Sequence, residues 1–149
     1  MKTRYFFITL FLICTSLSFA QDNWLDKYAN QDGITSVYIS KAMFQLMPNL
    51  DIDNVNLKTV SDKINSLSII TSEKKDVATK LSNKIKQEIS SEYAELMRVK
   101  NDSDLIIFRA IQQGEIINEL LLTVEEPDGY SVIKINGQFT LEDIRKMSN

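Results

Sequence analysis

Hydrophobic and polar positions change their period along this chain of 149 residues. In one segment apolar side chains recur every four residues, at Val77, Leu81, Ile85 and Ile89. This spacing is typical of the buried face of a helix, and lysines occupy many of the other positions. Ser72 stands where an N-cap is expected, so the pattern predicts an amphipathic helix that follows it.

Four later segments have the β-branched and aliphatic composition of strands. They are Tyr93–Val99, Leu105–Gln112, Ile116–Val124 and Tyr130–Ile135. Short runs of turn-forming residues separate them, and Asn136 with Gly137 is expected to end the last strand. Connections as short as these predict an antiparallel meander.

Shorter elements precede the amphipathic helix. They are a helix at residues 24–28, a strand at Ile34–Ile39, a helix that follows Ser40 and buries Met43, Phe44 and Met47, and a strand at Leu67–Thr71. Residues 49–66 show no clear pattern. Near the end of the chain, Thr140 and Asp143 have the spacing of a capping box, which predicts a short final helix.

The order of these elements predicts the fold class. After the first short helix it reads β-α-β-α-β-β-β-β-α, which favours an α+β fold: a mostly antiparallel sheet with helices packed on it. The sequence contains no linker, repeat or low-complexity tract. We therefore expect one domain at residues 22–149.

The first twenty residues have the pattern of a cleaved secretory signal peptide. Lys2 and Arg4 form a positive n-region, residues 5–13 form a short apolar core, and Ala20 completes a cleavage site of small residues. The apolar core is shorter than a bilayer-spanning helix, which needs about 20 residues. This pattern predicts a periplasmic or secreted protein without a transmembrane helix after cleavage.

Cys14 is the one cysteine of the chain, and it leaves a bacterial lipoprotein open as an alternative. The bulky Ile13 before it disfavours lipidation, so we interpret Cys14 as part of the cleaved segment. Removing residues 1–20 also removes two basic residues and no acidic one, which leaves 15 basic and 20 acidic residues. An acidic domain without a basic stripe is not expected to bind nucleic acid.

The composition of the mature chain restricts its chemistry. It contains neither cysteine nor histidine. Those absences exclude thiol nucleophiles, imidazole bases and nearly all zinc and copper sites, so we predict no catalytic residue, cofactor or metal. Asp51 and Asp53 could begin a calcium loop, but an EF-hand requires glycine where Asn56 stands and glutamate where Asp62 stands. The segment is therefore interpreted as a solvated turn.

One enzymatic alternative remains open. Ser72 and Lys75 form an S-x-x-K tetrad between a predicted strand and a predicted helix. Penicillin-binding serine acyl-enzymes use this spacing, with the lysine activating the serine. The chain lacks the accompanying S-D-N and K-T-G motifs. A serine/lysine hydrolase is therefore the alternative hypothesis rather than the main one.

Two predicted strands are apolar at consecutive positions, whereas a half-solvated strand alternates. Leu105–Phe108 and Leu120–Leu122 carry this feature. Either both faces of these strands are covered, or the second face is a surface that awaits a partner or a second copy. The candidate interaction residues are Leu105, Ile107, Leu120, Leu121 and Leu122. A groove for a small apolar ligand or lipid near Phe44 and Met47 is a further alternative.

Three segments together resemble a known family. They are residues 24–28 (WLDKY), residues 33–44 (GITSVYISKAMF) and residues 133–144 (IKINGQFTLEDI). They resemble the Bacteroidota family of small secreted proteins known as domain of unknown function number four-two-five-two. The resemblance implies a Gram-negative cell-envelope location and, through genes that often neighbour extracytoplasmic-function sigma factors, a link to envelope regulation. It implies no catalytic residues.

The leading functional hypothesis follows from these observations. We expect a non-enzymatic periplasmic binding or interaction module that captures an envelope protein or a second copy of itself. Many members of the family resemble lipoproteins, and this chain departs from them in lacking a proper lipobox.

Overall fold

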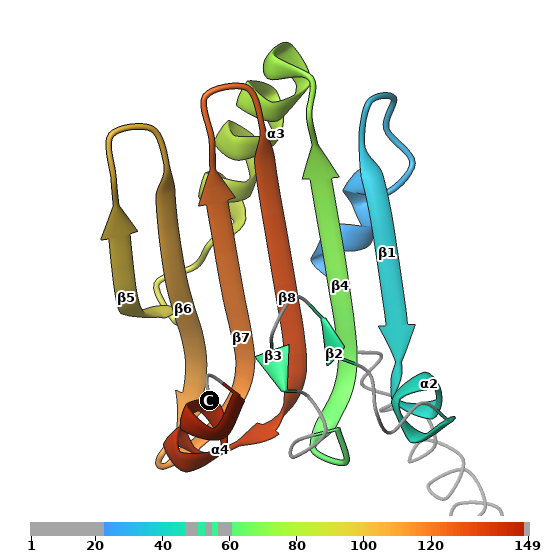
Figure 1. Cartoon of the computed structure of the whole chain (residues 1–149), viewed down its shortest axis with the longest axis vertical. Coiled ribbons are helices and arrows are strands. Elements are labelled where there is room, and N and C mark those ends of the chain that lie inside the picture. The colour runs from blue at the N-terminus through green and yellow to red at the C-terminus, as the bar shows by residue number, and fades with distance from the viewer. Residues whose placement is uncertain (1–22, 47–50, 53–54, 57–60, 148–149) are drawn as a thin grey trace, which may run out of the picture.

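A six-stranded antiparallel sheet forms the centre of the protein (Figure 1). The computed structural model describes residues 23–46, 51–52, 55–56 and 61–147. The strands lie in the order β1-β4-β8-β7-β6-β5. They are β1 (Thr35–Ser40), β4 (Ile64–Ser72), β5 (Ala94–Lys100), β6 (Leu105–Gln113), β7 (Ile116–Glu125) and β8 (Tyr130–Phe139). The predicted α+β class and the β5–β8 meander are both confirmed.

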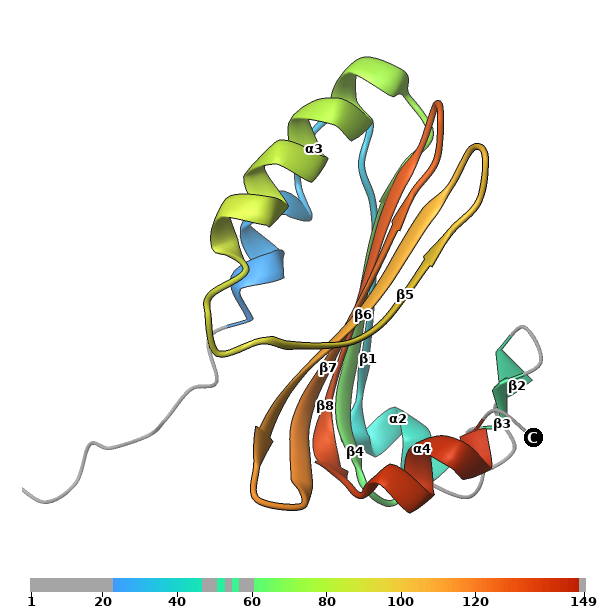
Figure 2. The same cartoon turned by 90° about the vertical axis from the view of Figure 1, so that its left-hand side faces the viewer.

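One face of the sheet is covered by the amphipathic helix α3 (Lys75–Glu88) and by the short 3-10 helix η2 (Trp24–Tyr28), as Figure 2 shows. The predicted stripe is largely correct, because Leu81 and Ile85 are buried against the sheet. Their core also contains residues of η2 and the sheet. These are Leu25, Tyr28, Ile70, Leu121, Tyr130 and Val132.

The opposite face carries α2 (Lys41–Leu46), α4 (Leu141–Met147) and the small hairpin of β2 (Asp51–Ile52) and β3 (Val55–Asn56). These elements gather at one end of the sheet (Figure 2). A second core lies beneath them, and its buried members are Phe44, Ile64, Leu67, Ala110, Ile117 and Phe139. The two faces of the sheet are thus covered to different extents.

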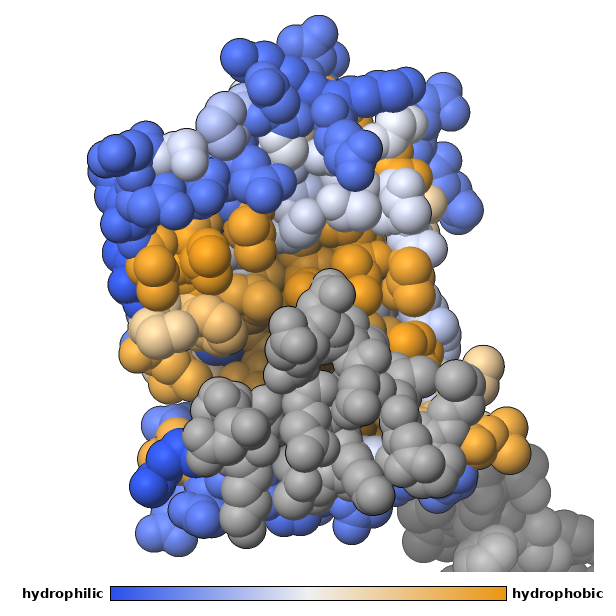
Figure 3. Space-filling view, viewed as in Figure 1, coloured by the Kyte–Doolittle hydropathy of each residue, from blue (hydrophilic) through white to orange (hydrophobic). Residues whose placement is uncertain are grey.

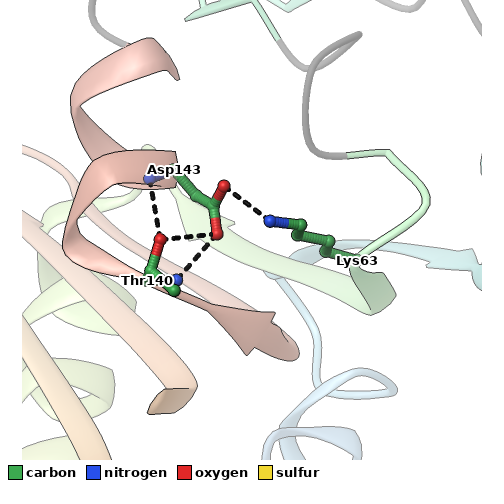
Figure 4. A network of polar contacts seen from close by, with 3 residues as sticks. All are labelled: Lys63, Thr140 and Asp143. Atoms are coloured by element: carbon green, nitrogen blue, oxygen red, sulfur yellow. Dashed lines mark hydrogen bonds and ion pairs between the residues drawn. The ribbon is translucent and has the colours of Figure 1, made fainter. Parts of the chain in front are cut away.

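A capping box begins α4, as the spacing of Thr140 and Asp143 predicted (Figure 4). The Thr140 backbone N–H donates to Asp143 Oδ2 at 2.8 Å, and the Asp143 N–H donates to Thr140 Oγ1 at 3.2 Å. Lys63 Nζ binds the other carboxylate oxygen of Asp143 at 2.7 Å. This ion pair and these hydrogen bonds lower the pKa of Asp143 to about 2. They attach α4 to the start of β4.

Three local predictions are wrong. Gly137 does not end the last strand, because β8 continues to Phe139. Ser72 belongs to β4 and is not the N-cap of α3; Lys74 holds that position without a side-chain cap. In α2 only Phe44 is buried among the described side chains, and Met43 is 46% exposed rather than part of the core.

The predicted signal peptide at residues 1–20, with Cys14, lies outside the described residues, as does Met47. Part of the unassigned segment 49–66 forms the β2–β3 hairpin and the start of β4. Within the described part of the chain, no helix combines the length and apolar character needed to cross a bilayer.

Candidate functional site: an open apolar face of the sheet

An uninterrupted apolar row crosses the whole sheet, with one residue from each strand. The pairing register aligns its members side by side. From the β1 edge to the β5 edge the row consists of Val37, Ile69, Ile133, Leu122, Phe108 and Met97. Because directly paired residues point to the same side of a sheet, all six belong to one face.

That face is the one opposite α3. The adjacent row contains Ile70 and Val132, which pack in the core beneath α3. Successive residues of a strand point to opposite faces, so Ile69 and Ile133 point away from α3. We call the surface formed by the six-residue row and its apolar neighbours the open face.

The row next to it, toward α2 and α4, is also apolar. Its members are Ile39, Leu67, Ile135, Leu120, Ala110 and Ala94. Phe44 of α2 and Phe139 belong to the core that covers this row. The apolar residues here are therefore accounted for by packing.

The row on the other side of the six-residue row, away from α2 and α4, is polar over one half of the sheet and apolar over the other half. Over β1, β4 and β8 it is polar, with Thr35, Thr71 and Ser131. Over β7, β6 and β5 it remains apolar, with Val124, Ile106 and Val99. The open face is therefore widest over the β5–β6–β7 side of the sheet.

Solvent reaches this surface among the described residues. Val37 is 42% exposed, Met97 48% and Val99 43%, and Leu122 and Phe108 are only partly buried. Figure 3 shows the result as a hydrophobic band across the middle of the face, between hydrophilic residues at one end and the α2–α4 end at the other. Monomeric proteins rarely leave so continuous an apolar surface without a use for it.

The candidate interaction residues divide between the two faces. Leu120 and Leu122 both point to the face opposite α3. Leu122 is only partly buried, whereas Leu120 packs against the second core. Ile107 and Leu121 are only 6% and 1% exposed and point to the α3 side, and Leu105 shares that orientation. These three residues therefore belong to the α3 side and not to the predicted interaction surface, because successive side chains of a strand point to opposite faces of the sheet.

The sequence analysis did not identify Val37, Ile69, Ile133 and Met97, and it included Phe108 only within the apolar stretch Leu105–Phe108. Each of these residues lies at the end of or within a predicted strand, but a run of consecutive apolar residues does not show which alternate positions share the exposed face. The alternation around Lys134, with Ile133 and Ile135 on either side, was the local signal that could have identified the face.

The S-x-x-K tetrad has no catalytic geometry in this structure. Ser72 is 2% exposed, and its Oγ accepts a hydrogen bond from the Lys74 backbone N–H at 3.3 Å. The Lys75 side chain extends into solvent and pairs with Asp128 at 3.5 Å. Lys75 lines a cleft of about 70 Å³ beside Tyr130, but Ser72 does not. The serine is thus a turn-stabilising residue at the end of β4.

A comparison of the sequence with known protein families found a matching family. The family described as "Domain of unknown function (DUF4252)" matches residues 28–147. The chain belongs to this family. No curated protein and no solved structure matches the chain. The match begins at Tyr28 and includes every strand of the sheet, so the open face lies entirely within the DUF4252 domain.

The α3 side of the domain contains a buried polar network. Lys134 is 3% exposed; its Nζ lies 3.5 Å from Glu119 Oε2 and 5.4 Å from the centre of the Trp24 ring. Glu119 also accepts a hydrogen bond from the Tyr93 hydroxyl. Burial and this carboxylate raise the pKa of Tyr93. The network joins η2 and the start of β5 to the sheet, and its lysine is too enclosed to act as a nucleophile.

Two other sites were predicted, a calcium loop that begins at Asp51 and an apolar groove near Phe44. The β2–β3 hairpin pairs Asp51 with Asn56, and the described residues contain no cluster of acidic side chains that could hold a metal ion. Phe44 is 1% exposed and packs in the second core, so it does not line a groove. The open face is therefore the strongest candidate site of the DUF4252 domain.

Proposed function

We propose that this protein is a non-enzymatic binding module of the cell envelope that holds a partner against the open face. The observation that carries the proposal is the six-residue apolar row from Val37 to Met97. A sheet face of this kind costs solvation free energy as long as water contacts it, and binding a partner removes that cost.

The dimensions of the face favour one amphipathic helix as the partner. Five strand spacings of about 4.8 Å give a row of about 24 Å, and over β5, β6 and β7 a second apolar row about 7 Å away widens the band to about 14 Å with its side chains. A helix is about 10–12 Å in diameter, and about 16 residues span 24 Å. α3, with 14 residues, covers the opposite face of the same sheet in a comparable way.

The same dimensions disfavour a globular partner. The band offers less than about 340 Å², whereas a stable interface between folded proteins buries about 800 Å² on each partner. A second copy packed face to face would therefore leave a weak contact. An amphipathic helix can use the whole band with its apolar face and keep its polar face in water.

A periplasmic location is part of the proposal, and it rests on the signal-peptide pattern of residues 1–20. The link to envelope regulation rests on the resemblance described above. The serine/lysine alternative loses its support with the burial of Ser72. The lipid alternative becomes a competing occupant of the open face, which the experiment below separates.

The test uses a synthetic 16-residue peptide of leucine and lysine with helical periodicity, and a peptide of the same composition in scrambled order. Binding to the purified protein is followed by fluorescence anisotropy. We expect the periodic peptide to bind with at least tenfold higher affinity than the scrambled one. Equal binding of the two would show charge attraction alone and contradict the proposal.

Variants then locate the binding surface. Met97→Asp and Leu122→Asp each place a charge on the open face and are expected to weaken peptide binding more than tenfold. Ile116→Asp is the matched control, because Ile116 is 40% exposed and lies outside the apolar row. Met97 is 48% exposed, so its substitution tests binding without disturbing the core.

Two other outcomes overturn the choice of partner. If sedimentation velocity shows a dimer that Met97→Asp dissociates, the occupant is a second copy. If native mass spectrometry shows a retained lipid that the same variant releases, the occupant is a lipid.

A further inference from the structure

The two edges of the sheet differ in how they are protected against pairing with another strand. β1 and β5 are the outer strands, so each presents backbone N–H and C=O groups that no other strand of this sheet binds (Figure 1). Proteins usually protect such an edge with charged side chains, a β-bulge or a proline, because an unprotected edge accepts a further strand. The two edges can therefore be compared within one molecule.

The β5 edge is protected. Its register with β6 shifts between Glu95 and Met97, which marks a bulge. Glu95, Arg98 and Lys100 are charged, and the Arg98 guanidinium donates two hydrogen bonds to the Glu95 carboxylate, at 2.8 and 2.6 Å. A strand added at this edge would therefore meet an irregular backbone and fixed charges.

The β1 edge has none of these protections. Its six residues, Thr35–Ser40, include no charged residue and no proline, and the register with β4 is continuous over all six. The first four residues are exposed, with Val37 at 42% and Tyr38 at 60%. The strand is of ordinary length and rich in β-branched side chains. It is therefore a regular, uncharged template for a further strand.

A second copy of the chain fits this edge better than other strands do. Two copies can join β1 to β1 about a twofold axis, which closes the assembly. A contact between β1 and the β5 edge of another copy would extend without closing, and the bulge and charges of β5 oppose it. A charged extended peptide would find no counter-charge on β1, whereas a second copy brings the same uncharged side chains.

The geometry of the sheet selects one register. Directly opposite residues of paired strands point to the same face, so the twofold axis must pass at a residue and not between two residues. With the axis at Val37, residues 35–39 pair with residues 39–35 of the second copy. With the axis at Tyr38, Lys41 at the start of α2 would lie opposite Thr35. The register centred on Val37 uses the strand most fully and keeps α2 beyond the paired segment.

The side chains match in this register. On the side opposite α3, Val37 faces Val37 of the second copy and Thr35 faces Ile39; on the α3 side, Ser36 faces Tyr38. Pairs of β-branched residues stabilise antiparallel strands, and alternate pairs exchange two main-chain hydrogen bonds. Because main-chain hydrogen bonds supply the affinity in strand addition, such a contact needs less area than two folded proteins packed face to face.

We propose that two copies of this protein pair through their β1 edges, in the antiparallel register centred on Val37, and so join two six-stranded sheets into one. We call this contact the β1 joint. The apolar row of the open face ends at Val37, so the rows of the two copies meet at the joint. The use of this longer row rests on the proposed function, whereas the joint itself does not.

Sedimentation velocity of the purified protein tests the proposal. The protein is measured from about 5 to about 500 µM, the range in which a small interface of micromolar affinity becomes populated. We expect the sedimentation coefficient to rise with concentration toward the value of a dimer and no further. A monomer over the whole range, or growth beyond a dimer, would overturn the β1 joint.

Two matched double variants locate the contact. Ser36→Lys with Tyr38→Lys places lysines directly opposite each other across the joint and is expected to weaken dimerisation more than tenfold. Both residues are exposed in a single copy, and circular dichroism checks that the variant is folded. Leu96→Lys with Val99→Lys adds the same charge to the β5 edge, at residues 42% and 43% exposed, and should leave the dimer unchanged. Equal weakening by both variants would show general charge repulsion and contradict the joint.

A complementary variant tests the register. Ser36→Glu with Tyr38→Lys places glutamate opposite lysine when the axis is at Val37. We expect this variant to dimerise at least tenfold more tightly than the double-lysine variant, because opposite charges replace like charges. An axis at Tyr38 would instead place the two lysines opposite each other. The absence of recovery would therefore contradict the proposed register.

The joint can be separated from the open face by one further variant. Met97 lies on β5, at the far edge of the sheet from β1. Met97→Asp is expected to weaken peptide binding on the open face and to leave the β1 dimer intact. A dimer that Met97→Asp dissociates would place the contact on the open face and overturn the joint. Loss of peptide binding without any change in the dimer would leave the joint standing.

Discussion

Gly137 lies against Lys63 so closely that a Cβ at residue 137 would be 2.3 Å from the Lys63 carbonyl oxygen. The same Cβ would lie 2.4 Å from the buried Phe139 ring. The next residue, Gln138, donates its backbone N–H to the same carbonyl at 3.1 Å. Glycine is needed here because two backbones and a core side chain meet, which joins the end of β8 to the start of β4.

The variant Gly137→Ala is therefore expected to lower the free energy of unfolding by about 2–4 kcal/mol, through overpacking. Gly114→Ala is the control. Gly114 has φ of +62°, and no heavy atom lies within 4 Å of the added Cβ. The Gly114→Ala variant should lose about 1 kcal/mol in the free energy of unfolding, because only the left-handed backbone conformation disfavours alanine there. Urea denaturation at pH 7 measures both values, and equal losses would contradict the close approach.

Acid should weaken the attachment of α4. Asp143 has a folded-state pKa of about 2 against an ordinary value of 3.8, because it is bonded to Lys63 and Thr140. A lowered pKa contributes stability that is present above about pH 4 and is lost as the pH falls toward 2. The contribution should be on the order of 1 kcal/mol, since Lys63 is partly exposed.

We expect Asp143→Asn to be less stable than the wild type at pH 7 and to differ little from it at pH 2. The matched control is Glu142→Gln in the same helix, whose pair with Arg145 is exposed. Thermal unfolding between pH 2 and pH 7 provides the measurement. A difference that stays constant over this range would show that the carboxylate charge contributes nothing.

The elements that sequence analysis found are those with local signals. α3 follows from its four-residue period, the meander from its short turns, and α4 from the Thr140–Asp143 box. The extension of β8 through Gly137 was missed because the Asn-Gly signal for a turn was overridden by the approach of Lys63, a residue far away in the sequence.

The candidate sites depended on information that no segment contains. Which of Leu120, Leu121 and Leu122 faces solvent depends on strand register, and a one-residue shift exchanges the two faces. The fold also brings Asn23 and Asn136 together from opposite ends of the chain, in the lining of one hollow of about 280 Å³. Neither asparagine has a neighbour in sequence that indicates the other, so only the fold reveals the hollow.

The buried ion pair of Lys134 and Glu119 should show strong coupling. Glu119→Gln keeps an acceptor for the Tyr93 hydroxyl but leaves the enclosed Lys134 ammonium without a counter-charge. We expect a loss of about 3 kcal/mol in the free energy of unfolding. Adding Lys134→Met removes the remaining charge and should recover most of that loss.

An exposed ion pair provides the comparison for this double-mutant cycle. Glu125 pairs with Lys86 at 3.0 Å, and both side chains are more than one-third exposed. Glu125→Gln should therefore cost less than 1 kcal/mol. If the Glu119 and Glu125 variants lose equal amounts of stability in urea, burial does not determine the strength of the Lys134 pair.

The burial of Ser72 leads to a prediction about reactivity. A fluorophosphonate probe labels activated, accessible serines, and Ser72 has neither property: it is 2% exposed and bonded to the Lys74 backbone. We expect no adduct at Ser72 in the folded protein by peptide mass spectrometry, with a known serine hydrolase in the same reaction as the positive control. Ser72→Ala should cost about 1 kcal/mol of stability for the lost hydrogen bond. An adduct at Ser72 that disappears in Lys75→Met would reinstate the hydrolase hypothesis and place the end of β4 at an active site.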